Sequence, residues 1–545
     1  MQKLPPLART ALLAVRVVAA IVALSAAPAR ARAQLPDVVE LSVEDVRAGL
    51  AAGRFTAVDL TRAFLERIDR YERRYNAFIS LVPDAVRTAE ALDREYARSG
   101  PRGPLHGVPV VIKDNIDYAG MPTTAGWEGF SYVSGGIDMV PGDDAVVVSR
   151  LRDAGAIVLG KTNLPDFARD GTRTTSSVAG ETLNPYHVGK VPGGSSGGTA
   201  TAVNASFAVL GLGTETGGSI QNPASAQGLV GVKPTHGLVP LEGIVPVSAT
   251  YLDVVGPLAR TVLDAAITLD VIAGPSDEDL ASYAGAGRTP EGGYAAATRT
   301  ASLEGKRLGL FGPGWRIDRF PLDTLTDALY ADAVATVEEL GAQVVEDPFR
   351  GSGFLELYDE RPDLPTDAWG DLDTYLMGLG PGAAFHSVAE WERLTGFEFR
   401  PDRRPDDQPL QVNRGSPRAR PAATADAYLG WRRDLLALFR RVMAEHDLDA
   451  LFFPQAAAPN RDLVEDPERP GYAPNNWPEI PSNIVNDLGV PVVTQPYAYY
   501  GDGTPFAVAW IGDSWTEADL LGFAAAFERA TQARKAPALS TARPN

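Results

Sequence analysis

Residues 193–198 of this chain read Gly-Gly-Ser-Ser-Gly-Gly, and the run of small residues that follows, 199–205, is typical of a helix. A glycine–serine string in isolation is most often a flexible linker. Linkers do not usually interrupt alternating strand and helix signals, and glycine lets backbone N–H groups approach a ligand closely. The string is therefore predicted to be a structured loop inside an α/β fold.

Strand-like and helix-like segments alternate on both sides of this loop. Helices are expected after the capping signals at 42–45 and 56–59, at 145–151, and at 517–528. Short apolar runs suited to buried strands occupy residues 108–112, 156–160, 208–212, 449–454 and 490–494. The alternation predicts a single large α/β domain with a mixed, mostly parallel central sheet and helices on both faces.

The predicted domain spans residues 34–536, and its local amino-acid composition changes in one region. Between residues 313 and 425, Pro, Asp, Arg and Gly become dense, which predicts loops and helices inserted over the core rather than an independent domain. Residues 537–545 are expected to form a loose tail. No internal repeat is evident.

Residues 1–33 have the pattern of a secretory signal peptide. Lys3 and Arg9 precede an apolar stretch, and Ala31-Arg32-Ala33 supplies the small-x-small pattern of a cleavage site. We therefore expect cleavage near Ala33 and a secreted or periplasmic protein. The alternative reading is an uncleaved amphipathic anchor, although Arg16 interrupts the apolar stretch too early for a spanning helix.

The amino-acid composition restricts the classes of molecule that this chain is expected to bind. A formal net charge of −19 argues against nucleic acid and anionic membranes as partners. Without cysteine the chain has no disulfide, so its stability comes from its core alone. We find no metal-ligand motif such as H-E-x-x-H and no dinucleotide fingerprint, so no metal or cofactor is expected. The oligomeric state is not encoded in any pattern that we recognise.

A lysine and two serines are the most economical parts for acyl transfer in this chain. Lys113 ends the apolar run 108–112, and Ser195 and Ser219 are both flanked by glycines. A hydroxyl needs a basic neighbour to become a nucleophile. Successive N–H groups around residues 216–219 can form a concave anion site. Each feature also has a plain structural reading, as a glycine turn or a lysine that extends its amine to the surface.

Several ordered motifs together make the chain resemble the amidase signature family. They cover about residues 40–315 and 445–530, whereas the segment 313–425 is covered poorly. Besides the glycine–serine string, they are Gly107-Val108-Pro109-Val110-Val111-Ile112-Lys113-Asp114-Asn115, Thr123-Thr124-Ala125-Gly126, Gly160-Lys161-Thr162-Asn163-Leu164-Pro165, Asn184-Pro185-Tyr186 and Gly228-Leu229-Val230-Gly231-Val232-Lys233-Pro234-Thr235. The resemblance implies an amidase signature fold and hydrolysis of carbon–nitrogen amide bonds.

The resemblance also implies roles for particular residues. Ser219 is then the nucleophile, Ser195 the bridging serine after a cis peptide bond, and Lys113 the base. The implied oxyanion hole consists of the backbone N–H groups of Thr216, Gly217, Gly218 and Ser219. The implied substrate contacts are Ser195 and the backbone at Ala168. Glu215 and Gln221 depart from the Asp and Arg of many members, a pattern that resembles the branch of secreted peptide amidases more than the tRNA-linked amidotransferases.

Such a mechanism makes a physical demand on Lys113. An ordinary lysine has a pKa of about 10.4, so a neutral amine at pH 7 costs about 4.6 kcal/mol. Burial among uncharged hydroxyls can lower a lysine pKa by about 3 to 5 units. We therefore expect Lys113 to be buried within reach of both serine hydroxyls.

Other functions remain open at this point. Gly193-Gly194-Ser195-Ser196-Gly197 also matches the G-x-S-x-G pattern of α/β-hydrolase esterases, in which Ser195 would be the nucleophile with His386 or His446 as partner. The ammonia-releasing glutaminase component of an amidotransferase shares the implied fold. A binding protein without catalysis is a third reading.

The substrate is expected to be a small-molecule or peptide amide, with peptide amides, aryl amides and carbamates as candidates. Four aromatic residues bear on this choice: Trp127, Phe130, Tyr132 and Trp477. If they line a cleft, aryl or peptide groups fit there. The alternative is that they belong to the core.

Overall fold

The computed structural model describes residues 35–315, 321–365, 368–399, 424–464 and 479–542. From Val38 onward, the described residues form one compact unit. The predicted signal peptide, 1–33, lies outside the described residues. Across the described ranges, no helix combines the length and the apolar character needed to cross a membrane.

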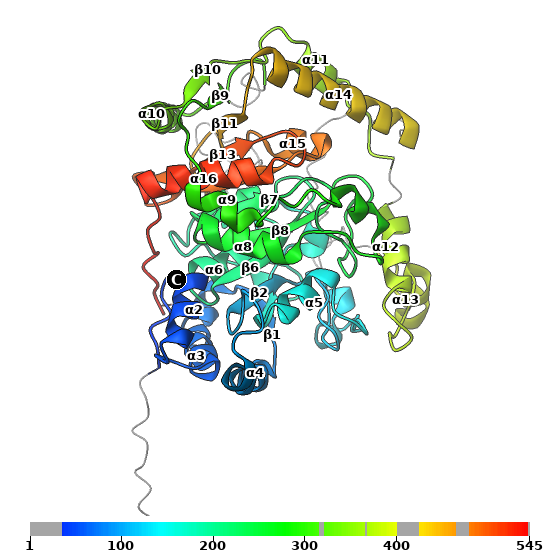
Figure 1. Ribbon diagram of the computed structural model, residues 1–545. Coiled ribbons are helices and arrows are strands. Elements are labelled where there is room, and N and C mark those ends of the chain that lie inside the picture. The colour runs from blue at the N-terminus through cyan, green and yellow to red at the C-terminus, as the bar shows by residue number, and fades with distance from the viewer. Residues whose placement is uncertain (1–34, 316–320, 366–367, 400–423, 465–478, 543–545) are drawn as a thin grey trace, which may run out of the picture. The chain divides into compact units, whose positions relative to one another are not determined.

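The core of the unit is an eleven-stranded sheet with the order β1-β3-β2-β6-β8-β7-β12-β13-β11-β9-β10 (Figure 1). A separate two-stranded sheet pairs β4 (Thr175–Ser176) with β5 (Gly180–Glu181). The strands of the large sheet are β1 (Phe78–Leu81), β2 (Pro109–Lys113), β3 (Ile157–Thr162), β6 (Leu210–Glu215), β7 (Val230–Lys233), β8 (Val254–Ala259), β9 (Arg307–Leu310), β10 (Gln343–Val345), β11 (Ala450–Pro454), β12 (Val492–Tyr499) and β13 (Pro505–Ile511).

Strand direction divides this sheet into regions. Parallel pairs form two groups, β3-β2-β6 and β11-β9-β10. The other neighbouring strands, from β6 through β8, β7, β12 and β13 to β11, pair antiparallel, and so does β1 with β3. The α/β domain with a mixed sheet is thus confirmed, and the parallel direction inferred from the alternation applies to the two groups.

Helices pack along the sheet. The capping boxes at Ser42 and Thr56 start two of them as the sequence predicts, because each side chain accepts the N–H of an aspartate three residues later. The helices are α2 (Val43–Ala51), α3 (Ala57–Tyr75), α4 (Ala85–Ser99), α5 (Val146–Asp153), α6 (Gly197–Asn204), α7 (Gln221–Ala226), α8 (Val262–Ile272), α9 (Tyr294–Thr300), α10 (Thr324–Glu339), α11 (Phe354–Asp359), α12 (Ala368–Met377), α13 (Val388–Thr395), α14 (Ala425–Glu445), α15 (Ser482–Leu488) and α16 (Glu517–Thr531).

The region 313–425 is more than the loops and helices expected there. It contains α10 to α13, but it also contributes β10, which extends the sheet by pairing parallel with β9. A strand of three residues directly after a helix is too short to show a periodic pattern, so no local signal marked it. The part 400–423 lies outside the described residues.

The two ends of the compact unit are joined by an ion pair. Arg534 follows α16, and its guanidinium binds the Glu40 carboxylate with N–O distances of 2.7 and 2.8 Å. In Figure 1 the chain that follows α16, drawn in red, runs toward α2. Further along, in the segment expected to be a loose tail, the Ser540 N–H donates to the Tyr75 hydroxyl at 3.0 Å.

Candidate active site

Lys113 is the last residue of β2, and its side chain is completely buried. Its Nζ donates to Ser195 Oγ at 2.7 Å, to Thr214 Oγ1 at 2.9 Å and to the Thr214 carbonyl at 3.2 Å. Because β2 lies between β3 and β6 in the parallel group, the strand end is shielded from water on both sides. The amine therefore has uncharged oxygen atoms as its hydrogen-bond partners.

This environment changes the acidity of the lysine. Burial lowers the pKa of Lys113 to about 7, while the negative charges of Asp253 and Glu215 raise that pKa by smaller amounts. A substantial fraction of the amine is neutral at pH 7 as a result. The neutral form has a lone pair that can accept a proton from a neighbouring hydroxyl.

Ser195 lies in a tightly packed loop that leads into α6. The Gly194–Ser195 peptide bond is cis. Gly194 donates its N–H to the Gly171 carbonyl at 3.0 Å, and a side chain at Gly194 would collide with the carbonyl oxygens of Asp170 and Arg173. The glycine–serine string is thus a structured loop, and the linker reading is wrong.

Residues 216–219 form the turn between β6 and α7, and they leave four N–H groups available. Among the described residues, the N–H groups of Thr216, Gly217, Gly218 and Ser219 donate no hydrogen bond. Gly218 has φ +97°, which favours glycine there. Successive unpaired N–H groups on a turn form a site for an oxyanion.

The hydroxyl of Ser219 is at the edge of this turn. Its side chain is 6% exposed, and within the described ranges its Oγ has no hydrogen-bond partner. The Ser196 N–H donates to the Ser219 carbonyl at 3.3 Å, which joins the two serine loops directly. The structure therefore brings the segments of Lys113, Ser195 and Ser219 together from three separate parts of the chain.

Two polar residues that the sequence analysis did not single out support this arrangement. Thr214 accepts from Lys113, and it also accepts from Asn115 Nδ2 at 3.0 Å through its hydroxyl. Asp253 accepts the Thr216 hydroxyl at 2.5 Å and the N–H groups of Val247 and Ser248 at 2.8 Å. Thr214 could have been found from the sequence, because it lies at the end of β6 directly before Glu215. No local sequence pattern points to Asp253.

Ala168 lies in a short 3-10 turn, Asp166–Ala168, that follows β3. Ala168 and Phe167 both have positive φ, +57° and +50°, and Ala168 is half-buried. The segment continues to Gly171, which accepts the Gly194 N–H. The backbone at Ala168 thus belongs to the chain segment that borders the Ser195 loop.

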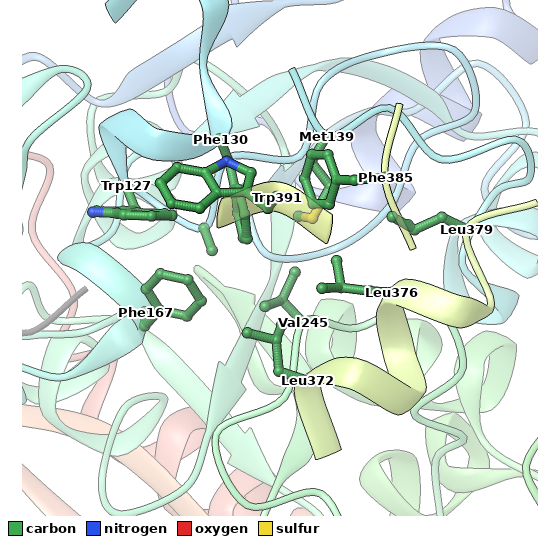
Figure 2. Close-up of a cluster of buried hydrophobic side chains, with 11 residues drawn as sticks. Trp127, Phe130, Met139, Phe167, Val245, Leu372, Leu376, Leu379, Phe385 and Trp391 are labelled. Carbon is green, nitrogen blue, oxygen red and sulfur yellow. The ribbon is translucent and has the colours of Figure 1, made fainter. Parts of the chain in front are cut away.

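The aromatic residues named from the sequence divide into core and surface. Trp127 and Phe130 are buried in a cluster with Phe167 and with side chains from α12 and α13, such as Leu372, Leu376 and Trp391 (Figure 2). Trp391 Nε1 donates to the Gly129 carbonyl at 3.0 Å, which fastens α13 to this cluster. Tyr132 is 75% exposed, and Trp477 lies outside the described residues. Trp127 and Phe130 are therefore core residues beneath the inserted helices.

The histidines required by an esterase reading lie elsewhere. His386 Nε2 bonds the Gly380 carbonyl within the insert, and His446 caps the end of α14. In the part of the chain that the structure describes, neither histidine contacts Ser195, whose hydroxyl is bound by Lys113. The structure gives no support to a Ser195–histidine pair.

Comparisons with known proteins show the family to which the chain belongs. A family model described as Amidase matches residues 59–521. The A subunit of glutamyl-tRNA(Gln) amidotransferase from Streptomyces coelicolor is 39% identical over 320 residues, a match that spans 57% of this chain and 60% of that protein. The corresponding protein of Symbiobacterium thermophilum is 35% identical over 512 residues, covering 90% of this chain and 96% of that protein. The solved native peptide amidase of Stenotrophomonas maltophilia matches with a TM-score of 0.75 and 34% identity, covering 92% of this chain and 99% of that chain.

Proposed function

This chain belongs to the amidase family, and we propose that it hydrolyses amide C–N bonds through an acyl-enzyme on Ser219, with Ser195 and Lys113 as the proton relay. The observation that supports this most is the 2.7 Å contact between a buried amine and the Ser195 hydroxyl. Burial lowers the pKa of that amine to about 7, so it can act as a base at neutral pH.

The proposed reaction runs in two stages. Neutral Lys113 accepts the Ser195 proton while Ser195 accepts the Ser219 proton, and Ser219 Oγ forms a bond to the carbonyl carbon. The carbonyl oxygen becomes an oxyanion, which the N–H groups of residues 216–219 stabilise. The C–N bond then breaks as the proton returns through Ser195 to the leaving nitrogen. In the second stage, water attacks the acyl-enzyme by the same relay and releases the acid.

We propose a peptide amide as the substrate class, with aryl amides and carbamates as alternatives. The support is the 34% identity to the Stenotrophomonas maltophilia peptide amidase over nearly its whole chain. The burial of Trp127 and Phe130 in the core argues against an open aromatic cleft built from these two residues. We also retain the proposal that residues 1–33 direct export to the periplasm or the medium, which N-terminal sequencing of the mature protein tests.

A second candidate is the release of ammonia from glutamine, as in an amidotransferase. Its support is the identity to amidotransferase A subunits, one of which aligns over 90% of this chain. The two candidates share the relay and differ in the acyl group that is transferred. Free glutamine as a substrate, compared with a C-terminally amidated peptide, separates them by kcat/KM.

The experiment that tests the relay is covalent labelling. A fluorophosphonate probe followed by peptide mapping is expected to modify Ser219, and Ser219→Ala is expected to abolish both the adduct and amide hydrolysis. The amide panel comprises an amidated peptide, an aryl anilide, a carbamate and glutamine. An adduct on Ser195 in place of Ser219 would support the esterase reading, and a folded protein that neither labels nor hydrolyses any amide would refute the proposal.

A further inference from the structure

We propose that Glu215 is a positioning residue that holds Ser219 and its N–H groups in place by means of a carboxylate clamp made only with uncharged donors. This inference rests on the proposed role of Ser219. Glu215 is one of the two residues in this segment that depart from the family pattern.

The clamp consists of four hydrogen bonds to one buried carboxylate. Glu215 Oε2 accepts the backbone N–H groups of Ile220 at 2.8 Å and Gln221 at 3.1 Å. Glu215 Oε1 accepts Gln221 Nε2 at 2.6 Å and Asn486 Nδ2 at 2.8 Å. Glu215 is 1% exposed, so these bonds form away from water, where bonds to a charged acceptor are strong.

The clamp is placed where it controls the backbone of Ser219. Glu215 precedes residues 216–219, and the two N–H groups that it accepts follow them directly. The carboxylate thus fixes the C-terminal end of the turn 216–219, and Asp253 fixes its N-terminal end by binding Thr216. With both ends fixed by other groups, the four N–H groups between them keep a common orientation and stay free to bind an oxyanion.

The absence of a cation in the clamp follows from the residues present. Within the described ranges, Glu215 forms no ion pair; Gln221 and Asn486 supply amide hydrogens instead. Asn486 belongs to α15, so the same carboxylate joins the nucleophile turn to a helix that lies 271 residues away in sequence. A carboxylate with four donors is satisfied, whereas the same carboxylate without them would be an uncompensated buried charge.

The negative charge of Glu215 also affects the pKa of Lys113, the proposed base. The acidic groups that act on Lys113 of β2 are Asp253, just before β8, and Glu215 of β6, and both raise the pKa of Lys113. The charge of Glu215 raises the pKa of Lys233 of β7 as well, against a larger lowering by burial. Removing that charge is therefore expected to lower the pKa of Lys113, which is a change that a purely structural residue would not produce.

Two substitutions separate the clamp from the charge. Glu215→Ala removes all four bonds. Its rate of Ser219 labelling by a fluorophosphonate and its kcat are expected to fall about 100-fold, with KM changed less than about threefold, since one misplaced turn loses transition-state contacts. Glu215→Gln keeps the size and shape of the side chain. If the side-chain amides of Gln221 and Asn486 rotate by 180°, their oxygens can accept the N–H groups of the new amide. The kcat of this variant is expected to fall less than about tenfold, and the acid limb of its kcat/KM profile is expected to move to lower pH.

Asn486→Ala tests the clamp without touching β6. It removes one of the four donors, and its labelling rate is expected to fall about tenfold. Asp264→Asn is the matched control, because Asp264 is a buried carboxylate in α8 that also accepts a backbone N–H, from Val43 at 3.0 Å. In the control the labelling rate and the acid limb are expected to stay as in the wild type.

Defined results overturn the inference. Labelling of Ser219 at the wild-type rate in folded Glu215→Ala, or an acid limb in Glu215→Gln that does not move, contradicts it. If Glu215→Ala lacks a cooperative thermal transition, Asn486→Ala decides, and a wild-type labelling rate there also contradicts the clamp. A wild-type protein that fails to label at Ser219 refutes the proposed function itself, which is a separate outcome.

Discussion

Two buried lysines on neighbouring strands of the same sheet have opposite surroundings. Lys113 ends β2, and Lys161 lies in β3; in the parallel register Lys113 pairs with Thr162, and Ile112 pairs with Lys161. Because successive side chains alternate, the two lysines point to opposite faces of the sheet. Both side chains are completely buried.

The partners of the two amines differ in charge. Lys161 Nζ forms an ion pair with Asp114 Oδ1 at 3.0 Å and donates to Thr123 Oγ1 at 2.6 Å. Among the described residues, only hydroxyl and carbonyl oxygens lie within hydrogen-bond distance of the Lys113 amine. The difference in partners indicates that burial by itself does not make a lysine a base. A lysine that is buried without a carboxylate partner can become one, whereas a paired lysine stabilises the fold.

The largest expected effect comes from replacing the unpaired lysine. Lys113→Met is expected to lower kcat/KM about 10⁴-fold, because the proposed general base is lost. The same change is expected to raise the free energy of unfolding by about 2 kcal/mol at pH 7. Keeping a lysine with a folded pKa of about 7 costs about 4 kcal/mol at pH 7, and the lost hydrogen bonds offset part of that gain. Enzyme kinetics and thermal unfolding measure the two effects.

The gain in stability must also depend on pH in a defined direction. The pKa of Lys113 is lowered in the folded state, so the unfolded state binds more protons between pH 7 and about 10.4. Wild-type stability therefore rises relative to Lys113→Met as the pH increases through this window. A difference between the two proteins that stays constant from about pH 7 to pH 10 would contradict the explanation.

The next largest effect concerns the paired lysine. Lys161→Met leaves Asp114 as an uncompensated buried charge, which is expected to lower the free energy of unfolding by about 3 to 5 kcal/mol. The double variant Lys161→Met with Asp114→Leu is expected to recover most of that loss. Chemical denaturation of the three proteins measures it. Equal stability of the single variant and the wild type would show that the two lysines are not different in kind.

The smallest expected effect is the pH dependence of the wild-type enzyme. Since the neutral form of Lys113 is the proposed base, kcat/KM is expected to rise about tenfold per pH unit below pH 7 and to level off above it. Initial rates on an uncharged amide between about pH 5 and pH 9 measure the profile. A midpoint at about pH 4 would instead assign the acid limb to a carboxylate.

The sequence predicted well those parts of the site that depend on local pattern. Lys113 at a strand end, the capping boxes at Ser42 and Thr56, and the glycines before Ser219 are all signals within a few residues. The burial of Lys113 next to the Ser195 hydroxyl was also expected, because the proposed role as an uncharged base requires both. The roles of Ser195 and Ser219 remain predictions for the labelling experiment.

The remaining features depend on contacts between distant segments. Asp253 binds Thr216, and Asn486 binds Glu215, across 37 and 271 residues, and no local pattern connects such pairs. β10 was missed because three residues show no period. The sequence could not show whether Trp127 is a core residue or lines a cleft. Trp127 is buried because side chains of α12 and α13 pack against it, and those helices are distant in sequence.

The ion pair between Glu40 and Arg534 has a consequence for biosynthesis. The two residues are 494 positions apart, and Arg534 also donates to the Gly228 carbonyl at 2.7 Å. Arg534 is synthesised 494 positions after Glu40, so a nascent chain that has not yet reached Arg534 lacks this ion pair. The segment around Glu40 can therefore form this ion pair only after the region around Arg534 has been synthesised.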